Sequence, residues 1–167
     1  MQMSAMHLTG ARKIAAAAGL AVCALTSGAS ADSKVVSGAS CVLTVGTNLT
    51  RSAAGIRNNE TGNVTVFCSL LRDNTANNNG LTSLRISATA NNGTAGLNEC
   101  TVYSLNAWGE RLPSEPSCGQ INPAISNGTA IWDFGSALNQ SAAGGSYVIR
   151  VSIRPGQTLK SIYYNEP

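Results

Sequence analysis

The residues of this sequence best suited to chemistry are carboxylates, two of which have aromatic neighbours. Glycoside hydrolysis needs only two carboxyl groups, one on each side of the scissile bond, and four are candidates: Glu99, Glu110, Glu115 and Asp133. Glu110 follows Trp108 by two residues, and Asp133 lies between Trp132 and Phe134. The favoured interpretation is nevertheless structural. At least one of Trp132 and Phe134 fills a core, and Trp108 anchors a loop.

Nucleophilic catalysis lacks a suitable base in this sequence. The only histidine, His7, lies within the first 31 residues, which have the features of a cleaved leader. A Ser-His-Asp or Cys-His mechanism needs a group that titrates near neutral pH. Beyond the leader the lysines are Lys34 and Lys160, and neither stands in an S-x-x-K arrangement. We therefore assign no catalytic residue and expect no cofactor.

Residues 1–31 have the three parts of an export signal. A region ending in Arg12-Lys13 precedes an apolar run at residues 14–25, and an A-x-A cleavage site follows at residues 29–31. The apolar run is too short to cross a bilayer, which needs about 20 residues. Cys23 could alternatively accept a lipid, but Val22 stands where such sites usually have a small residue. The sequence predicts an exported protein, periplasmic or extracellular, with no transmembrane segment.

The charge balance beyond the leader argues against a nucleic-acid partner. The chain has 11 basic and 8 acidic side chains, and removing Arg12 and Lys13 leaves nine basic ones. Nucleic-acid binding needs clustered Lys and Arg, whereas these charges are scattered singly. Asn, Ser, Thr and Gly dominate instead. This composition is typical of an exported β protein, and it allows contact with polysaccharide through hydrogen bonds.

Four cysteines beyond the leader predict two disulfides. Cys23 lies in the leader, which leaves Cys41, Cys68, Cys100 and Cys118. An even number of cysteines in an oxidising compartment favours disulfides. Four cysteines allow three pairings, and we favour Cys41–Cys68 with Cys100–Cys118 because each then closes a modest loop. A zinc site is disfavoured, since the chain has no C-x-x-C spacing and no histidine beyond the leader.

A weak calcium candidate lies in the polar run at residues 73–80. Asp73, Asn77 and Asn79 supply the oxygen ligands that hard cations require. The run lacks the further carboxylates and the distal glutamate of an EF-hand loop. Asn and Gly also favour turns by themselves. We therefore favour a turn without a metal.

The hydrophobic pattern predicts short strands separated by turns. Residues 64–71 and 146–153 alternate most clearly, and Gly, Pro and Asn clusters separate the strand candidates. Residues 106–127 form the longest irregular stretch. About seven or eight strands with no helical period predict one all-β domain at residues 32–167, an antiparallel β-sandwich or jelly roll.

Three segments resemble a group of small exported bacterial proteins of unassigned function. They are residues 64–73 (VTVFCSLLRD), residues 98–103 (NECTVY) and the C-terminal hairpin from residue 146 to residue 164. The resemblance covers about half of residues 32–167. In that group a cysteine often stands where this chain has Val151, which makes Cys118 the substitute partner of Cys100. The resemblance implies export and a disulfide-linked sandwich, and it supplies no catalytic residue.

Three functions remain open from the sequence. The first is a non-catalytic binding or interaction module for envelope glycan or another surface protein, with Trp108 and Glu110 as the ligand-binding candidates. The second is a pilin-like structural subunit completed by a neighbour's strand, for which residues 32–40, with Val35-Val36, would be the arm. The third is a glycoside hydrolase that uses carboxylates alone. We rank them in that order.

Overall fold

The computed structural model describes residues 32–72, 80–91, 94–113, 116–135 and 144–166. Some of the sequence-based expectations fall outside these ranges. They are the leader at residues 1–31, the calcium candidates Asp73, Asn77 and Asn79, and the carboxylate Glu115.

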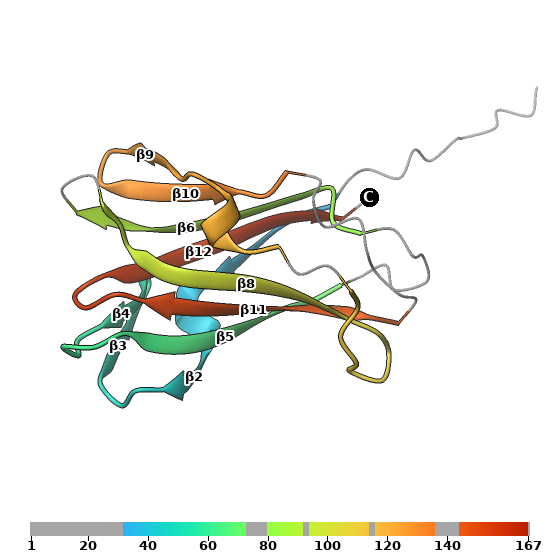
Figure 1. The fold of residues 1–167 in the computed structure, drawn as a ribbon, viewed down its shortest axis with the longest axis horizontal. Helices are drawn as coiled ribbons and strands as arrows, with labels where there is room; N and C mark the ends of the chain where they lie inside the picture. Colours follow the sequence, from blue (N-terminus) through green and yellow to red (C-terminus); the bar gives the residue numbers. More distant parts are fainter. Residues whose placement is uncertain (1–31, 73–79, 92–93, 114–115, 136–143, 167) are drawn as a thin grey trace, which may run out of the picture.

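Two antiparallel sheets pack face to face (Figure 1). The larger has the order β3-β4-β12-β6-β10-β9; in addition β1 pairs with β12, and β7 pairs with β6. Its strands are β1 (Asp32–Ser37), β3 (Leu49–Ser52), β4 (Gly55–Asn58), β6 (Ser83–Asn91), β7 (Thr94–Ala95), β9 (Ala124–Ser126), β10 (Thr129–Asp133) and β12 (Thr158–Glu166). The smaller sheet has the order β2-β5-β11-β8. Its strands are β2 (Val42–Val45), β5 (Val64–Leu70), β8 (Leu97–Leu105) and β11 (Ser146–Ile153), and the short 3-10 turns are η1 (Gly38–Ser40) and η2 (Cys118–Gln120).

The predicted all-β antiparallel sandwich is confirmed. The described residues contain twelve strands rather than seven or eight. The difference comes from short strands such as β7 and β9, which have two and three residues. Runs of that length show no period-two alternation, so the sequence does not distinguish them from loops. In the described ranges no helix is long and apolar enough to span a membrane.

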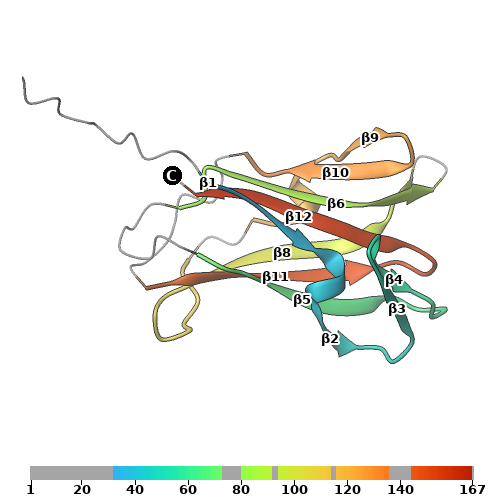
Figure 2. The ribbon, with the colours of Figure 1, turned by 180° about the vertical axis from the view of Figure 1, so that it is seen from behind.

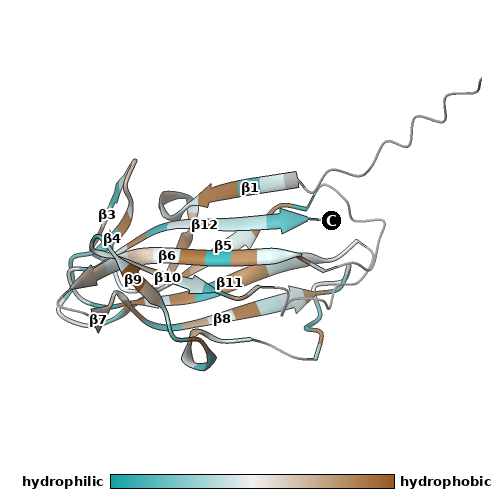
Figure 3. Cartoon of the chain, turned by 90° about the horizontal axis from the view of Figure 1, so that it is seen from above, coloured by the Kyte–Doolittle hydropathy of each residue, from teal (hydrophilic) through white to brown (hydrophobic). Residues whose placement is uncertain are grey.

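The core lies between the inward faces of the two sheets. Successive side chains of a strand point to opposite faces, and the hydropathy of β6 alternates accordingly in Figure 3. From the larger sheet, Leu84, Ile86 and Ile162 are fully buried. Val66 and Ile149 meet them from the smaller sheet.

The aromatic pair that flanks Asp133 belongs to this core. Trp132 and Phe134 are 3% and 4% exposed. The structural interpretation of these two aromatic residues is therefore confirmed.

Two disulfides fasten irregular segments to the smaller sheet. Cys41, directly after η1, is bonded to Cys68 on β5, and Cys100 on β8 is bonded to Cys118 at the start of η2. These are the pairs favoured from loop length. All four cysteines are buried, and the bonds close separations of 27 and 18 residues. Loops of that size stabilise the folded state by about 3 kcal/mol each in the chain-entropy model.

The buried side chain of Asn58 holds the turn at which the chain crosses from one sheet to the other. This turn joins β11, in the smaller sheet, to β12, in the larger one. Asn58 is 0% exposed, and its Nδ2 donates to the carbonyl oxygens of Ile153 at 2.9 Å and Gly62 at 2.8 Å. Its backbone N–H donates to Gln157 and its carbonyl accepts from Gly156, both at 2.9 Å. The side chain and the backbone of this one residue therefore connect the crossover to β4.

The N-terminal strand completes the larger sheet of its own chain. β1 pairs with β12 from Asp32 opposite Glu166 to Ser37 opposite Ser161, and Figure 2 shows the two strands side by side. Lys34 Nζ lies 2.8 Å from a carboxylate oxygen of Glu166, and that carboxylate also lies 3.4 Å from Arg72 Nε. The segment that a pilin-like subunit would use as its arm is thus a strand of the chain's own larger sheet.

The substitution Asn58→Ala should lower the free energy of unfolding by roughly 3 kcal/mol. It removes hydrogen bonds to two carbonyl groups and leaves the buried carbonyl of Ile153 without this donor. Chemical denaturation measures the loss. The control is Asn98→Ala, at an exposed position of β8, which should change stability by no more than about 0.5 kcal/mol. An Asn58→Ala variant within about 1 kcal/mol of the parent would show that the crossover does not depend on this side chain.

Candidate functional site

A tight hairpin at the end of β8 carries the first candidate site. The chain reverses after Leu105, which forms an antiparallel bridge with Arg111. The backbone N–H of Asn106 donates to the carbonyl of Glu110 at 2.9 Å, and that of Leu112 donates to Ser104 at 2.8 Å. We call residues 105–111 the Trp108 hairpin. Its two sides continue the ladder of the smaller sheet, so its tip is attached to a rigid strand.

The side chain of Asn106 organises the tip of the Trp108 hairpin. Its Oδ1 accepts from the backbone N–H groups of Trp108 and Glu110, both at 2.9 Å. Its Nδ2 donates to Glu110 Oε2 at 2.8 Å. Asn and Asp favour such turns because their short side chains bond to the backbone a few residues on. Gly109 adopts a φ of 79°, the left-handed conformation that completes the reversal.

An aromatic contact fixes the base of the hairpin to the smaller sheet. The guanidinium carbon of Arg111 lies 4.1 Å from the centre of the Tyr103 ring, a cation–π geometry. Tyr103 is itself 7% exposed and stacks on Phe67, with ring centres 6.4 Å apart. The hairpin is therefore anchored by Arg111 and Tyr103.

Trp108 is not the loop anchor that the sequence led us to expect. Its side chain is 86% exposed, and no other large apolar side chain of the described ranges is exposed to this extent. The expectation was wrong because the hairpin is stabilised by Asn106 and Arg111 instead. The indole thus stands in water on a backbone that its own neighbours hold in place.

Two of the candidate carboxylates, Glu99 and Asp133, lie on opposite sides of the core. Glu99 lies on the exposed side of β8 and faces Arg150, with 3.4 Å between Oε1 and Nη1. Asp133 lies on the outer face of the other sheet, so the core separates the two acids. Glu110 is at the hairpin tip. A glycosidase needs two carboxyl groups on either side of one bond, and Glu99 and Asp133 cannot meet this requirement.

The environment of Asp133 favours its ionised form. The backbone N–H of Gly135 donates to Oδ1 at 2.9 Å, and Arg85 Nε donates to Oδ2 at 2.8 Å. The Gly135 hydrogen bond, assisted by the hydrogen bond and charge of Arg85, outweighs the partial burial and lowers the pKa of Asp133 below its ordinary value. A general acid needs a raised pKa, so Asp133 is unsuited to that role.

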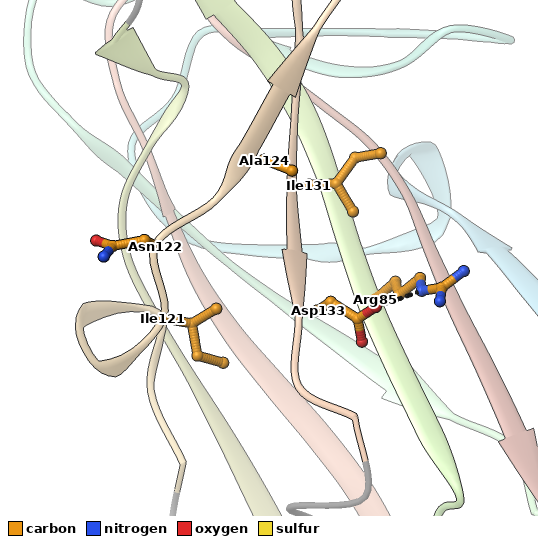
Figure 4. Close-up of a pocket in the computed structure, with 6 residues that line it drawn as sticks. All are labelled: Arg85, Ile121, Asn122, Ala124, Ile131 and Asp133. Carbon is orange, nitrogen blue, oxygen red and sulfur yellow. Dashed lines mark hydrogen bonds and ion pairs between the residues drawn. The ribbon is translucent and has the colours of Figure 1, made fainter.

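A pocket on the outer face of the larger sheet is the second candidate site. Its volume is about 310 Å³. Its lining residues, drawn in Figure 4, are Arg85, Ile121, Asn122, Ala124, Ile131 and Asp133. The sequence indicated Asp133 only as a candidate catalytic acid and did not predict this pocket. A signal was present: Ile131 is an apolar residue on the side of residues 129–133 that otherwise carries Thr129 and Asp133.

Metal binding finds no support in the described residues. These ranges contain no group of three or more His, Cys, Asp or Glu side chains placed to hold an ion.

Comparisons with known proteins give a distant likeness of fold. No family model and no curated protein matches the chain. It is similar to the catalytic unit of a thermostable GH87 α-1,3-glucanase from Streptomyces thermodiastaticus strain HF3-3, with 12% identity and a TM-score of 0.41 over 80% of this chain, but it spans only 26% of that chain. It is also similar to the xylan-binding module CBM15, with 15% identity, a TM-score of 0.44, and coverage of 81% of this chain and 97% of that one. Neither likeness is close enough to carry an argument about ligand or activity.

Replacing Asn106 should loosen the tip of the Trp108 hairpin and leave the sandwich intact. In Asn106→Ala the backbone N–H groups of Trp108 and Glu110 lose their common acceptor, so their hydrogen exchange should accelerate at least roughly tenfold. Exchange at core amides such as that of Ile149 should stay within about twofold of the parent. NMR-detected exchange measures both. Unchanged exchange at Trp108 and Glu110 would contradict the role given to Asn106.

The ion pair of Asp133 should contribute little to stability, with a defined pH dependence. Arg85 and Asp133 are 53% and 47% exposed, so solvent screens the pair, and Asp133→Asn should cost less than about 1 kcal/mol at pH 7. Because folding lowers the pKa of Asp133, its contribution is complete above the unfolded-state pKa of about 3.9. It is lost as the pH falls through the lower folded-state pKa.

Denaturation of both proteins between about pH 7 and pH 2 measures this contribution. The stability difference should shrink toward zero at the acid end. A difference that grows as the pH falls would show that folding raises the pKa of Asp133 instead.

Proposed function

We propose that this chain is an exported, non-catalytic carbohydrate-binding module that stacks a sugar ring on Trp108. The observation that carries the proposal is the 86% exposure of this indole on a hairpin tip fixed by Asn106. A large aromatic residue loses favourable free energy when it stays in water. An exposed indole on a fixed backbone is therefore better explained by a ligand than by folding.

The geometry of the hairpin suits a pyranose ring. One face of a sugar ring carries mainly C–H groups, which pack on the flat indole, while its rim carries hydroxyl groups. Glu110 lies two residues from Trp108, is exposed, and has its carboxylate held by Asn106. It supplies an oriented acceptor for a hydroxyl hydrogen. Because the tip is already ordered, binding immobilises few additional groups, which favours affinity.

The disulfides and the leader support a location outside the cytoplasm. The two buried disulfides are typical of proteins from oxidising compartments. The leader at residues 1–31 would direct the chain there. A protein in that location has access to polysaccharides of the cell envelope and of the surrounding medium.

The two alternative functions have weaker support. A pilin-like subunit would need a strand from a neighbour, but β1 already pairs with β12 along its whole length. A carboxylate glycosidase would need two acids across one bond, and Glu99 and Asp133 lie on opposite outer faces of the sandwich.

Calorimetric titration with soluble neutral polysaccharides tests the proposal. Xylan, a mixed-linkage β-glucan, a β-1,3-glucan and dextran form the panel, and at least one should bind. Trp108→Ala should weaken that binding at least about tenfold, or about 1.4 kcal/mol. Trp108→Phe keeps a flat ring and should retain affinity within about threefold.

The matched control is Leu71→Ala, another exposed apolar side chain, 76% exposed and outside the hairpin. It should leave affinity unchanged. Absence of binding to every glycan, or undiminished binding by Trp108→Ala, would refute the proposal. If the panel is negative while Trp108→Ala abolishes capture of a purified envelope protein, the site is a protein interface instead.

A further inference from the structure

The outer face of the larger sheet presents an ordered row of side chains across four strands. The pairing register places Val35 opposite Tyr163, Tyr163 opposite Arg85, and Arg85 opposite Asp133. Paired strands lie about 4.8 Å apart, so the row spans roughly 14 Å. The guanidinium carbon of Arg85 lies 5.9 Å from the centre of the Tyr163 ring. Aromatic, cationic and anionic groups therefore form one continuous strip.

A second row beside this strip consists of small hydroxyl side chains. Ser37 pairs with Ser161, Ser161 with Ser87, and Ser87 with Ile131. The hydroxyl groups of Ser87 and Ser161 lie 2.8 Å apart, within hydrogen-bonding distance. This serine row leads across the sheet to Ile131, which is a wall of the pocket in Figure 4.

The pocket combines apolar walls with one ion pair, whose opposite charges compensate each other. Ile121, Ala124 and Ile131 supply the apolar surface, and Arg85 and Asp133 supply opposite charges 2.8 Å apart. Its volume of about 310 Å³ is at the lower end of the range for small-molecule sites. Since the two charges compensate each other, the pocket attracts neither anions nor cations strongly. It retains donors on the guanidinium and acceptors on the carboxylate for a ligand with hydroxyl groups.

We propose that this pocket is a second subsite of the same module and takes a neutral sugar residue. The apolar face of the sugar packs on Ile121 and Ile131, and its hydroxyls bond to Arg85 and Asp133. The glycan chain continues over the serine row toward Tyr163. This inference rests on the proposed glycan-binding function and extends it, because the Trp108 hairpin lies at a separate place on the sandwich (Figure 1). Two separate contacts on one polymer raise its overall affinity.

NMR titration of the ¹⁵N-labelled protein tests this subsite. The probes are three neutral oligosaccharides (xylohexaose, cellohexaose and laminarihexaose) and one anionic oligosaccharide, hexagalacturonic acid. At least one neutral probe should shift the amide signals of Arg85, Ile131 and Asp133 as well as those of the Trp108 hairpin. In Trp108→Ala the pocket signals should still shift.

Ile131→Ala and Ile125→Ala form a matched pair of variants. Ile131 and Ile125 are 36% and 44% exposed and lie on neighbouring strands. Ile131 pairs with Ala124, so Ile125, the next residue of β9, faces the opposite side. Ile131→Ala should weaken binding at the pocket at least about fivefold and leave the hairpin shifts unchanged. Ile125→Ala should change the affinity of the pocket by less than about twofold.

The possible outcomes separate the two proposals. Shifts confined to the Trp108 hairpin would overturn the pocket subsite and support the proposed function. Shifts at the pocket with none at the hairpin would support the subsite and overturn the role of Trp108. Pocket shifts with hexagalacturonic acid alone would overturn the neutral ligand class. An absence of shifts with every probe would overturn both proposals.

Discussion

The crossover between β11 and β12, held by the buried Asn58, joins the two sheets at their inner strands. β11 is an inner strand of the smaller sheet, between β5 and β8, and β12 is an inner strand of the larger one. The carbonyl of Ile153 at the end of β11 and the backbone of Gly156 and Gln157 before β12 all bond to Asn58. Because consecutive strands occupy the middle of opposite sheets, this turn fixes how the two layers face each other. Neither sheet is complete without residues 146–166, so most of the pairings join distant parts of the chain, a topology that is expected to fold slowly.

Strand pairing that starts from these two inner strands determines where each candidate site lies. On one side, β11 pairs with β8 from Ser146 opposite Leu105, and β8 continues directly into the Trp108 hairpin. On the other side, the register of β12 against β6 places Tyr163 opposite Arg85, and β6 against β10 places Arg85 opposite Asp133. A one-residue slip of β12 would turn Tyr163 into the core and Tyr164 to the surface. The burial of Tyr164, Ile162 and Leu159 thus determines which residues reach the outer face.

The sequence predicted the features that depend on residues close together in the chain. It missed most of the features that depend on particular side-chain contacts or on pairing between distant segments. Alternation along residues 64–70 and 146–153 is a property of the strand itself, and cysteine spacing limits the loops that disulfides close, so the sandwich and both bonds could be predicted. β9 is an exception: it is too short to show a period, although the Asn127-Gly128 turn that joins it to β10, with positive φ at both residues, is a local signal. The exposure of Trp108 depends on Asn106 and Arg111, whose contacts no hydrophobic pattern encodes. The pocket needs Arg85, Ile121 and Ile131 from separate segments, and only the sheet register brings them together.

In the proposed module, a bound glycan covers the exposed indole of Trp108. Iodide quenching of tryptophan fluorescence tests it in the unaltered protein, because iodide reaches exposed indoles and the chain has only two tryptophans, of which Trp132 is buried at 3% exposure. We expect strong quenching of the free protein and a marked loss of quenching at saturating concentrations of a bound polysaccharide. Quenching that stays the same while calorimetry shows the glycan to be bound would contradict it.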